Sequence, residues 1–92
     1  MIRLQNATLA VINTEYSVKL TNVHGFKLKS ANSTAFRIAY ETGKVASSVD
    51  PYYTVAAGVV HEYDPGVSNG KGENITAYLA ASVTDIIFIE VW

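Results

Sequence analysis

Apolar and polar residues alternate with a period of two through most of this 92-residue chain. The clearest examples are residues 16–20, 26–29, 36–40 and 75–80, where every second side chain is apolar or aromatic. Successive side chains of a β-strand point to opposite faces, so this pattern predicts strands with one apolar face. No segment repeats the i, i+3, i+4 spacing of an amphipathic helix.

Further strands are predicted where the alternation is less regular. Residues 8–12 form a short apolar run, residues 53–55 are rich in strand formers, and residues 59–63 alternate again. Gly58 interrupts the pattern and indicates a bulge or a bend. Residues 86–92 are apolar on nearly both faces, which is typical of a central strand covered on both sides.

Turn residues separate these segments at intervals of roughly 8–12 residues, the spacing of sandwiches and barrels. Gly43 lies in a tight turn and is expected to have a positive φ. The expected turns cover residues 13–14, 30–33, 41–44, 64–66 and 82–85. We therefore predict an all-β fold, an antiparallel, jelly-roll-like β-sandwich of about seven or eight strands, as one domain over residues 1–92.

The composition narrows the classes of function. Charged residues make up 16% of the chain and hydrophobic residues 49%, with seven basic and eight acidic side chains and no cysteine. A typical domain has about 25% charged residues. The near-neutral balance argues against nucleic acid as a partner, and no apolar run is long enough for a membrane-spanning helix. Gln5 and Asn6 interrupt the first apolar residues, so we expect no signal peptide and synthesis in the cytoplasm.

The motifs that could carry chemistry are incomplete. Residues 66–72 resemble a phosphate-binding loop, but they have one residue too few between the glycines, and Gly72 stands where Ser or Thr would hold magnesium. His61 and Glu62 are neighbours on a predicted strand, so their side chains point to opposite faces and cannot bind one metal ion together. We expect no enzyme, with no catalytic residue, cofactor or metal site.

Low charge suggests contact with other proteins. Lys27 and Lys29 would protect a strand at a sheet edge from pairing with another chain. The uncharged residues 9–12 and 75–81 would instead favour a partner if either segment were an edge or a surface. We therefore predict permanent assembly, as a homo-oligomer or with other proteins.

Two groups of residues are candidates for the partner interface. Tyrosine is common at interfaces because its apolar ring carries a polar tip, although tyrosines also pack at the rim of a sandwich. Exposed rings could alternatively stack on sugars. The N-terminal residues could form an arm that adds to a neighbour's sheet. The candidate interface residues are Met1, Ile2, Arg3, Leu4, Gln5, Tyr52, Tyr53 and Tyr63.

The pattern of residue classes from residue 34 onward, about two-thirds of the chain, is similar to a known group. It consists of Thr-Ala-Phe-Arg-Ile-Ala-Tyr at 34–40, the turn at Gly43, Tyr-Thr-Val-Ala-Ala-Gly at 53–58, and the run 75–92 that ends in Trp. This pattern resembles the small all-β accessory proteins of tailed-bacteriophage virions.

The resemblance implies a head decoration, cement or fibre-base protein on the capsid surface, often trimeric and bound to the major capsid protein. It implies no catalytic residues. We therefore expect a non-enzymatic virion structural protein that stabilises the head. The alternative is a carbohydrate-binding or receptor-binding module that uses Tyr52, Tyr53 and Tyr63.

Overall fold

Eight β-strands and no helix are found in residues 2–64 and 72–92, the part of the chain that the computed structural model describes. The strands are β1 (Arg3–Leu9), β2 (Tyr16–Val23), β3 (Phe26–Ser30), β4 (Phe36–Ala39), β5 (Tyr53–Val55), β6 (His61–Tyr63), β7 (Glu73–Ala80) and β8 (Asp85–Val91). The turn predicted at 64–66 and most of the glycine-rich segment 66–72 lie outside the described residues.

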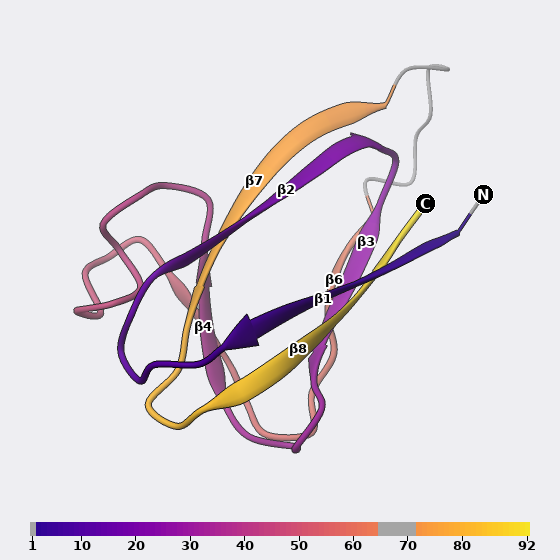
Figure 1. The fold of residues 1–92 in the computed structure, drawn as a ribbon. Coiled ribbons are helices and arrows are strands. Elements are labelled where there is room, and N and C mark those ends of the chain that lie inside the picture. Colours follow the sequence, from indigo (N-terminus) through magenta and orange to yellow (C-terminus); the bar gives the residue numbers. More distant parts are fainter. Residues whose placement is uncertain (1, 65–71) are drawn as a thin grey trace.

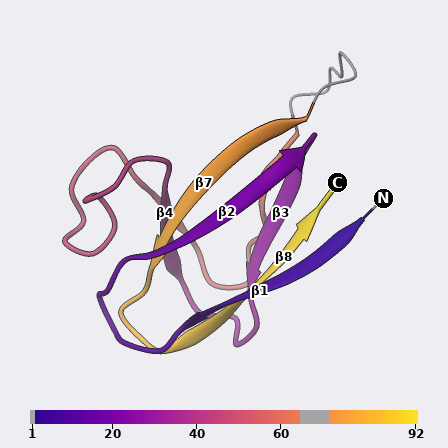
Figure 2. The ribbon, with the colours of Figure 1, turned by 45° about the horizontal axis from the view of Figure 1, so that its top comes forward.

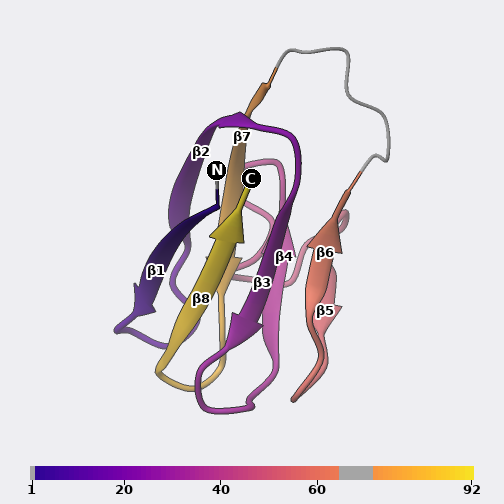
Figure 3. The same cartoon turned by 90° about the vertical axis from the view of Figure 1, so that its right-hand side faces the viewer.

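The strands form two four-stranded antiparallel sheets that pack face to face. The order is β1-β8-β3-β6 in sheet A and β2-β7-β4-β5 in sheet B (Figures 1 and 3). Strands 1 and 8, 2 and 7, 3 and 6, and 4 and 5 are therefore neighbours, the pairing of a jelly roll. The predicted all-β sandwich is confirmed.

Most connections carry the chain from one sheet to the other. The loop after β1, for example, crosses from sheet A to β2 in sheet B (Figure 2). Consecutive strands therefore seldom pair with each other, and the structure depends on contacts between residues that are distant in the sequence.

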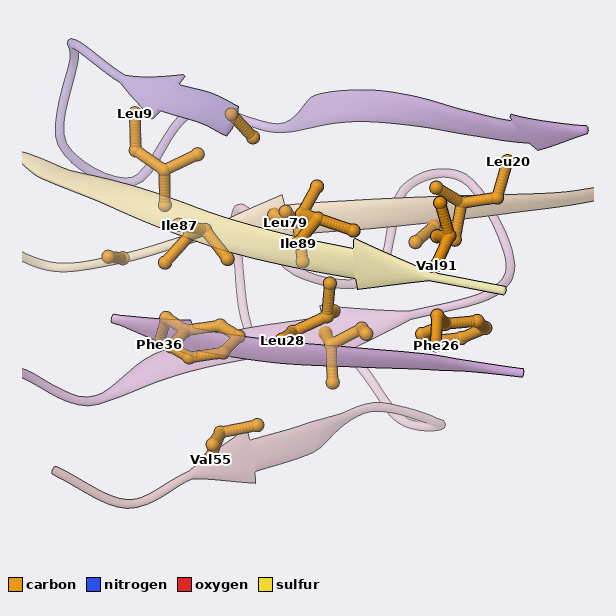
Figure 4. Packing of buried hydrophobic residues seen from close by; sticks show 14 of the residues in the cluster. Leu9, Leu20, Phe26, Leu28, Phe36, Val55, Leu79, Ile87, Ile89 and Val91 are labelled. Atoms are coloured by element: carbon orange, nitrogen blue, oxygen red, sulfur yellow. The ribbon is translucent and has the colours of Figure 1, made fainter. Parts of the chain in front are cut away.

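The core lies between the two sheets and consists of the side chains that point inward, every second one along each strand (Figure 4). Ile87, Ile89 and Val91 of β8 lie at the centre of sheet A, and Leu79 of β7 faces them from sheet B. The other large, fully buried side chains that share this space are Leu9, Leu20, Val23, Phe26, Leu28, Phe36 and Ile38.

The first strand differs from the prediction. A strand was expected over residues 8–12, but β1 begins at Arg3 and ends at Leu9, and Val11 and Ile12 are exposed outside it. The register with β8 accounts for the difference, because Arg3 lies opposite Val91 and Leu9 opposite Asp85. Pairing with the seven residues of β8 thus sets the bounds of β1, and polar residues such as Gln5 and Asn6 are included in the strand.

The placing of two other segments also needs correction. Lys27 and Lys29 do not protect a sheet edge, because β3 lies between β8 and β6. The uncharged residues 75–80 belong to β7, which likewise lies between β2 and β4 and is paired on both sides. The predicted central position of residues 86–92 is confirmed, but their coverage on both faces is wrong, since Ile86 and Phe88 are exposed.

Glycines are found where the chain turns. Gly43 has a φ of 82° in the turn after β4, as predicted. Gly58 has a φ of 76° and lies in the connection between β5 and β6. This turn continues to Val60, so the strand expected over 59–63 begins only at His61. Both positions favour glycine because a Cβ disfavours the left-handed region.

One buried carboxylate holds the turn after β3 against the start of β8. Asp85 accepts hydrogen bonds from the hydroxyl groups of Ser30 (2.5 Å) and Thr34 (2.6 Å), and from the Asn32 side-chain amide (3.2 Å). The backbone N–H of Ile86 donates a further one at 2.7 Å. Burial raises the pKa of Asp85, but these four hydrogen bonds together outweigh it and hold the pKa below the ordinary value of 3.8.

We predict that Asp85→Asn destabilises the fold by about 1–3 kcal/mol at pH 7, because the amide replaces one of the two acceptor oxygens by an NH2 group and two of the four donors lose their acceptor. A carboxyl whose pKa is lower in the folded state stabilises the protein above its unfolded pKa, and this contribution is lost as the pH falls through the folded pKa. In urea unfolding, the gap between the natural protein and the variant should therefore narrow as the pH falls below the ordinary pKa of 3.8 and through the lower folded-state pKa. The exposed Glu62→Gln is the control, and a gap independent of pH would contradict the assignment.

Candidate functional site

The outer faces of the two sheets differ in how they are covered. Residues 40–52, which join β4 to β5, fold over the outer face of sheet B and bury a small cluster of Ala39, Val45 and Ala80 there. Tyr52 and Tyr78 pack against this cluster, and the Arg37 guanidinium donates a hydrogen bond to the Val45 carbonyl at 2.6 Å. The outer face of sheet B is thus covered over β4 and β7 by the chain itself, while the outward side chains of β2 stay exposed.

The outer face of sheet A carries large apolar side chains that remain exposed. Leu4 on β1 is 79% exposed, Phe88 on β8 is 46% exposed, and Ile86 and Val60 are exposed as well. Leu4, Val60 and Phe88 line one shallow hollow of about 430 Å³. We call Leu4, Val60, Ile86 and Phe88 the apolar face.

Charged side chains lie beside and between the residues of this apolar face. Glu90 lies opposite Leu4 on one side and opposite Lys27 on the other. Lys29 lies opposite Phe88 on β3, the strand between β8 and β6, and so separates Phe88 from Val60. Lys27 is 4.0 Å from the Glu62 carboxylate and 5.8 Å from the centre of the Trp92 ring. Apolar and charged groups occur together at many protein–protein interfaces.

The structure places the N-terminal candidates in and beside β1. Arg3, Leu4 and Gln5 are paired with Val91, Glu90 and Ile89 of β8, so they do not form a free arm. Ile2 precedes the strand and is exposed, and Met1 lies outside the described residues. What β1 offers to a neighbour is the side of its backbone that faces away from β8.

The tyrosines lie on the opposite side of the sandwich, near β5. Tyr40, Tyr52 and Tyr53 line a second hollow, of about 370 Å³, together with the carboxylates Glu41 and Asp50. Tyr53 is 65% exposed, so one aromatic ring is free to contact a ligand. Two of the three predicted tyrosines are thus brought together, and Tyr40 joins them.

Tyr63 lies outside this hollow. Its ring stacks on Phe26 with the ring centres 5.3 Å apart, and its hydroxyl donates a hydrogen bond to Glu73 at 3.0 Å. This bond, burial and the carboxylate charge raise the pKa of Tyr63, in that order of size. The predicted stacking surface of Tyr52, Tyr53 and Tyr63 is therefore not a single surface.

A hydrogen bond of 3.1 Å joins the Tyr40 hydroxyl to His61 Nε2 behind this hollow. Burial, followed by the neighbouring Tyr53 and Tyr63, raises the pKa of Tyr40 to about 12. Burial lowers the pKa of His61 below its ordinary 6.5, so this imidazole is neutral at pH 7. The pair supplies hydrogen-bonding groups rather than charge.

Neither region gathers the groups of a metal centre. In residues 2–64 and 72–92, no three His, Asp or Glu side chains lie together in a way that could hold a metal ion. The same part of the chain contains no helix long and apolar enough to cross a membrane. The groups that the two regions offer are apolar side chains on sheet A, and aromatic rings and hydrogen-bonding groups near β5.

Several of these residues are not among the sequence candidates. Ile86 and Phe88 belong to the run 86–92, which is apolar on nearly both faces. That pattern predicts that both side chains are buried, so it does not identify them as surface residues. Val60 and Tyr40 have no distinctive signal, because their exposure depends on where the turns before and after them end.

A comparison of the chain with protein-family models, with curated proteins and with solved structures finds no match. The geometry of its own surfaces therefore carries the functional inference.

The exposure of Phe88 predicts a contrast between neighbouring residues of β8. Phe88→Thr should change the free energy of unfolding by about 1 kcal/mol, because threonine also favours strands and only about half of the Phe88 side chain is buried. Ile87→Ala, directly beside it but in the core, should cost about 2–5 kcal/mol. Urea unfolding measures both, and an equal loss at the two positions would contradict the exposure of Phe88.

Proposed function

We propose that this protein is a non-enzymatic structural protein of a virion, a capsid decoration or cement protein that stabilises the head by binding subunits of the major capsid protein. The observation that carries the proposal is the uncovered apolar face of sheet A. The resemblance of residues 34–92 to phage accessory proteins supports the choice of a virion partner.

The energetics of the apolar face favour a protein as the partner. Burying a Leu or Phe side chain completely contributes about 1.5–3 kcal/mol, so covering Leu4 and Phe88 would yield part of that for each. The neighbouring charges of Lys27, Lys29 and Glu90 would set the orientation of the partner, since complementary charges mainly provide specificity. A capsid subunit with apolar groups and complementary charges at matching positions fits this surface.

The fold supports the proposal by analogy alone. Jelly rolls recur in viral capsid proteins and in lectins, so the topology is compatible with a virion protein and with a glycan-binding module alike. Because one fold serves many functions, the choice between them rests on the surfaces. The apolar face exposes the side chains Leu4, Val60, Ile86 and Phe88, whereas the second hollow is lined by tyrosines and carboxylates, so the apolar face is the better suited to a protein partner.

We predict that Phe88→Thr weakens binding to empty heads of the protein's own virus at least tenfold, which corresponds to about 1.4 kcal/mol. The physical reason is the loss of the central aromatic contact of the apolar face. Cosedimentation with the heads, at a series of protein concentrations, gives the dissociation constants.

The matched control is Val11→Thr, which changes an exposed apolar residue in the loop after β1, outside the apolar face. It should bind like the natural protein. Failure of the natural protein to bind heads would refute the proposal, and equal loss in both variants would refute the assigned surface.

A second function, carbohydrate or receptor-glycan binding, is favoured by one specific observation. Tyr40, Tyr52 and Tyr53 line a hollow whose other groups include the Glu41 and Asp50 carboxylates. Aromatic rings can stack on the C–H face of a sugar, while carboxylates accept hydrogen bonds from its hydroxyl groups.

If the protein binds glycans, Tyr53→Ala should abolish the signal on a glycan array, because Tyr53 is the most exposed ring of the hollow. Tyr63→Phe keeps its ring against Phe26 and lies outside the hollow, so it should leave binding unchanged. Binding that survives Tyr53→Ala would exclude this hollow as the glycan site.

A further inference from the structure

We propose that the edge of β1 pairs with β1 of a second copy of this chain, antiparallel and across a two-fold axis, so that two sheets A become one eight-stranded sheet. This inference goes beyond the proposed function, which concerns the apolar face and a capsid partner. It concerns the backbone of one strand and a partner that is the chain itself.

The four edge strands of the sandwich differ in how they are protected from pairing. β5 and β6 have three residues each, and β2 has a register irregularity between Leu20 and Val23 and an exposed Lys19. Short strands, bulges and lysines are the usual means of preventing edge-to-edge association. Each of these three edges therefore has at least one such device.

β1 has none of these devices. It has seven residues in unbroken register with β8, and no residue from Leu4 to Leu9 is charged. Its one charged residue, Arg3, reaches toward β2 and donates a hydrogen bond to the Thr21 carbonyl at 2.8 Å. Figure 3 shows β1 at the outer side of sheet A, with no described strand beyond it.

The direction of the backbone groups of β1 follows from the pairing of β8. Trp92 and Gly25 exchange two backbone hydrogen bonds, and the Ile86 carbonyl accepts one from Ala31, so even-numbered residues of β8 face β3. Backbone groups alternate sides along a strand, which leaves the odd-numbered residues of β8 facing β1. Their partners in β1 are Arg3, Gln5, Ala7 and Leu9.

The even-numbered residues of β1 therefore direct their N–H and C=O groups away from the sheet. These residues are Leu4, Asn6 and Thr8, and the side chains of all three are exposed. Three donors and three acceptors stand in a row along this edge, in the spacing of an antiparallel ladder.

A second copy satisfies this row completely when the two-fold axis passes by Asn6, the middle residue of β1. Asn6 then lies opposite Asn6 of the other copy, and Leu4 opposite Thr8, which gives about six backbone hydrogen bonds. No like charges face each other in this register, since Leu4, Asn6 and Thr8 are all uncharged. The edge is thus complementary to itself.

Two-fold pairing also places both apolar faces on the same side of the joined sheet. Two such faces on one rigid unit could engage two neighbouring sites together, which raises the overall affinity without a new contact. An isologous contact of this kind closes at two copies, so it yields a dimer and not the trimer implied by the resemblance.

The first test uses the natural protein. Sedimentation equilibrium should give twice the chain mass of 10.0 kDa at high micromolar concentration, and the monomer on dilution. Over the same range, amide hydrogen exchange of Leu4, Asn6 and Thr8 should slow with increasing concentration, while that of Val11 and Ile12 should not change.

The second test places opposite charges at the axis. Asn6→Lys and Asn6→Glu each put like charges face to face and should weaken self-association, whereas an equimolar mixture of the two should associate more tightly than either alone, by about threefold or more in Kd. Asn6→Pro should abolish the dimer yet keep the fold, because the lost N–H points away from β8. Circular dichroism and thermal unfolding verify folding of each variant.

Three results would overturn the inference. They are a natural protein that is monomeric or trimeric at high micromolar concentration, a dimer unaffected by Asn6→Pro, and a mixture of the charged variants no tighter than its components. Slowed exchange at Leu4, Asn6 and Thr8 that appears only with capsid protein would likewise assign the edge to another partner. The self-association measurements contain no heads, so a failure to dimerise would leave the proposed capsid binding unaffected. Equally, a failure to bind heads would leave the proposed dimer unaffected.

Discussion

The structure depends on β8, which pairs with β1 on one side and β3 on the other and so joins the first and last segments of the chain. Its odd-numbered residues, Ile87, Ile89 and Val91, are buried between the sheets. A shift of one residue in this register would expose all three, because side chains alternate with a period of two. The same alternation sends Ile86 and Phe88 outward, so the core and the exposed apolar face arise from one constraint.

The two outer faces show how differently the chain treats its sheets. Residues 40–52 cover the part of sheet B formed by β4 and β7 and bury Val45 there, which gives the long segment between β4 and β5 a packing role. No described segment covers sheet A in this way, although Phe88 is as apolar as anything that the loop buries. An apolar side chain on a strand costs little when exposed singly, but several together on a chain with only 16% charged residues favour contact with another molecule.

The sequence predicted the architecture better than it predicted the surfaces. Alternation in 16–20, 26–29, 36–40 and 75–80 identified β2, β3, β4 and β7, because those strands bury one face and local patterning is sufficient. Strand order could not be read from local patterning, so Lys27 and Lys29 were expected at an edge although β3 lies inside sheet A. The bounds of β1 were missed for a related reason, since its polar residues become strand only by pairing with β8. Whether the outer face of a sheet is covered depends on where a loop folds, and the alternation of apolar and polar residues does not predict the path of a loop.

The backbone and the side chains of β1 divide the possible contacts of sheet A between them. Because Leu4, Asn6 and Thr8 turn their hydrogen-bonding groups to the edge and their side chains to the outer face, one set of residues serves both surfaces. A change of side chain at Leu4 alters the apolar face and leaves the edge groups in place, whereas proline at Asn6 removes an edge donor and leaves Phe88 untouched. Edge pairing extends sheet A without covering its outer face, so a second copy at β1 and a different protein on Phe88 can be bound together. The tyrosine hollow near β5 lies on the far side of the sandwich and is compatible with both.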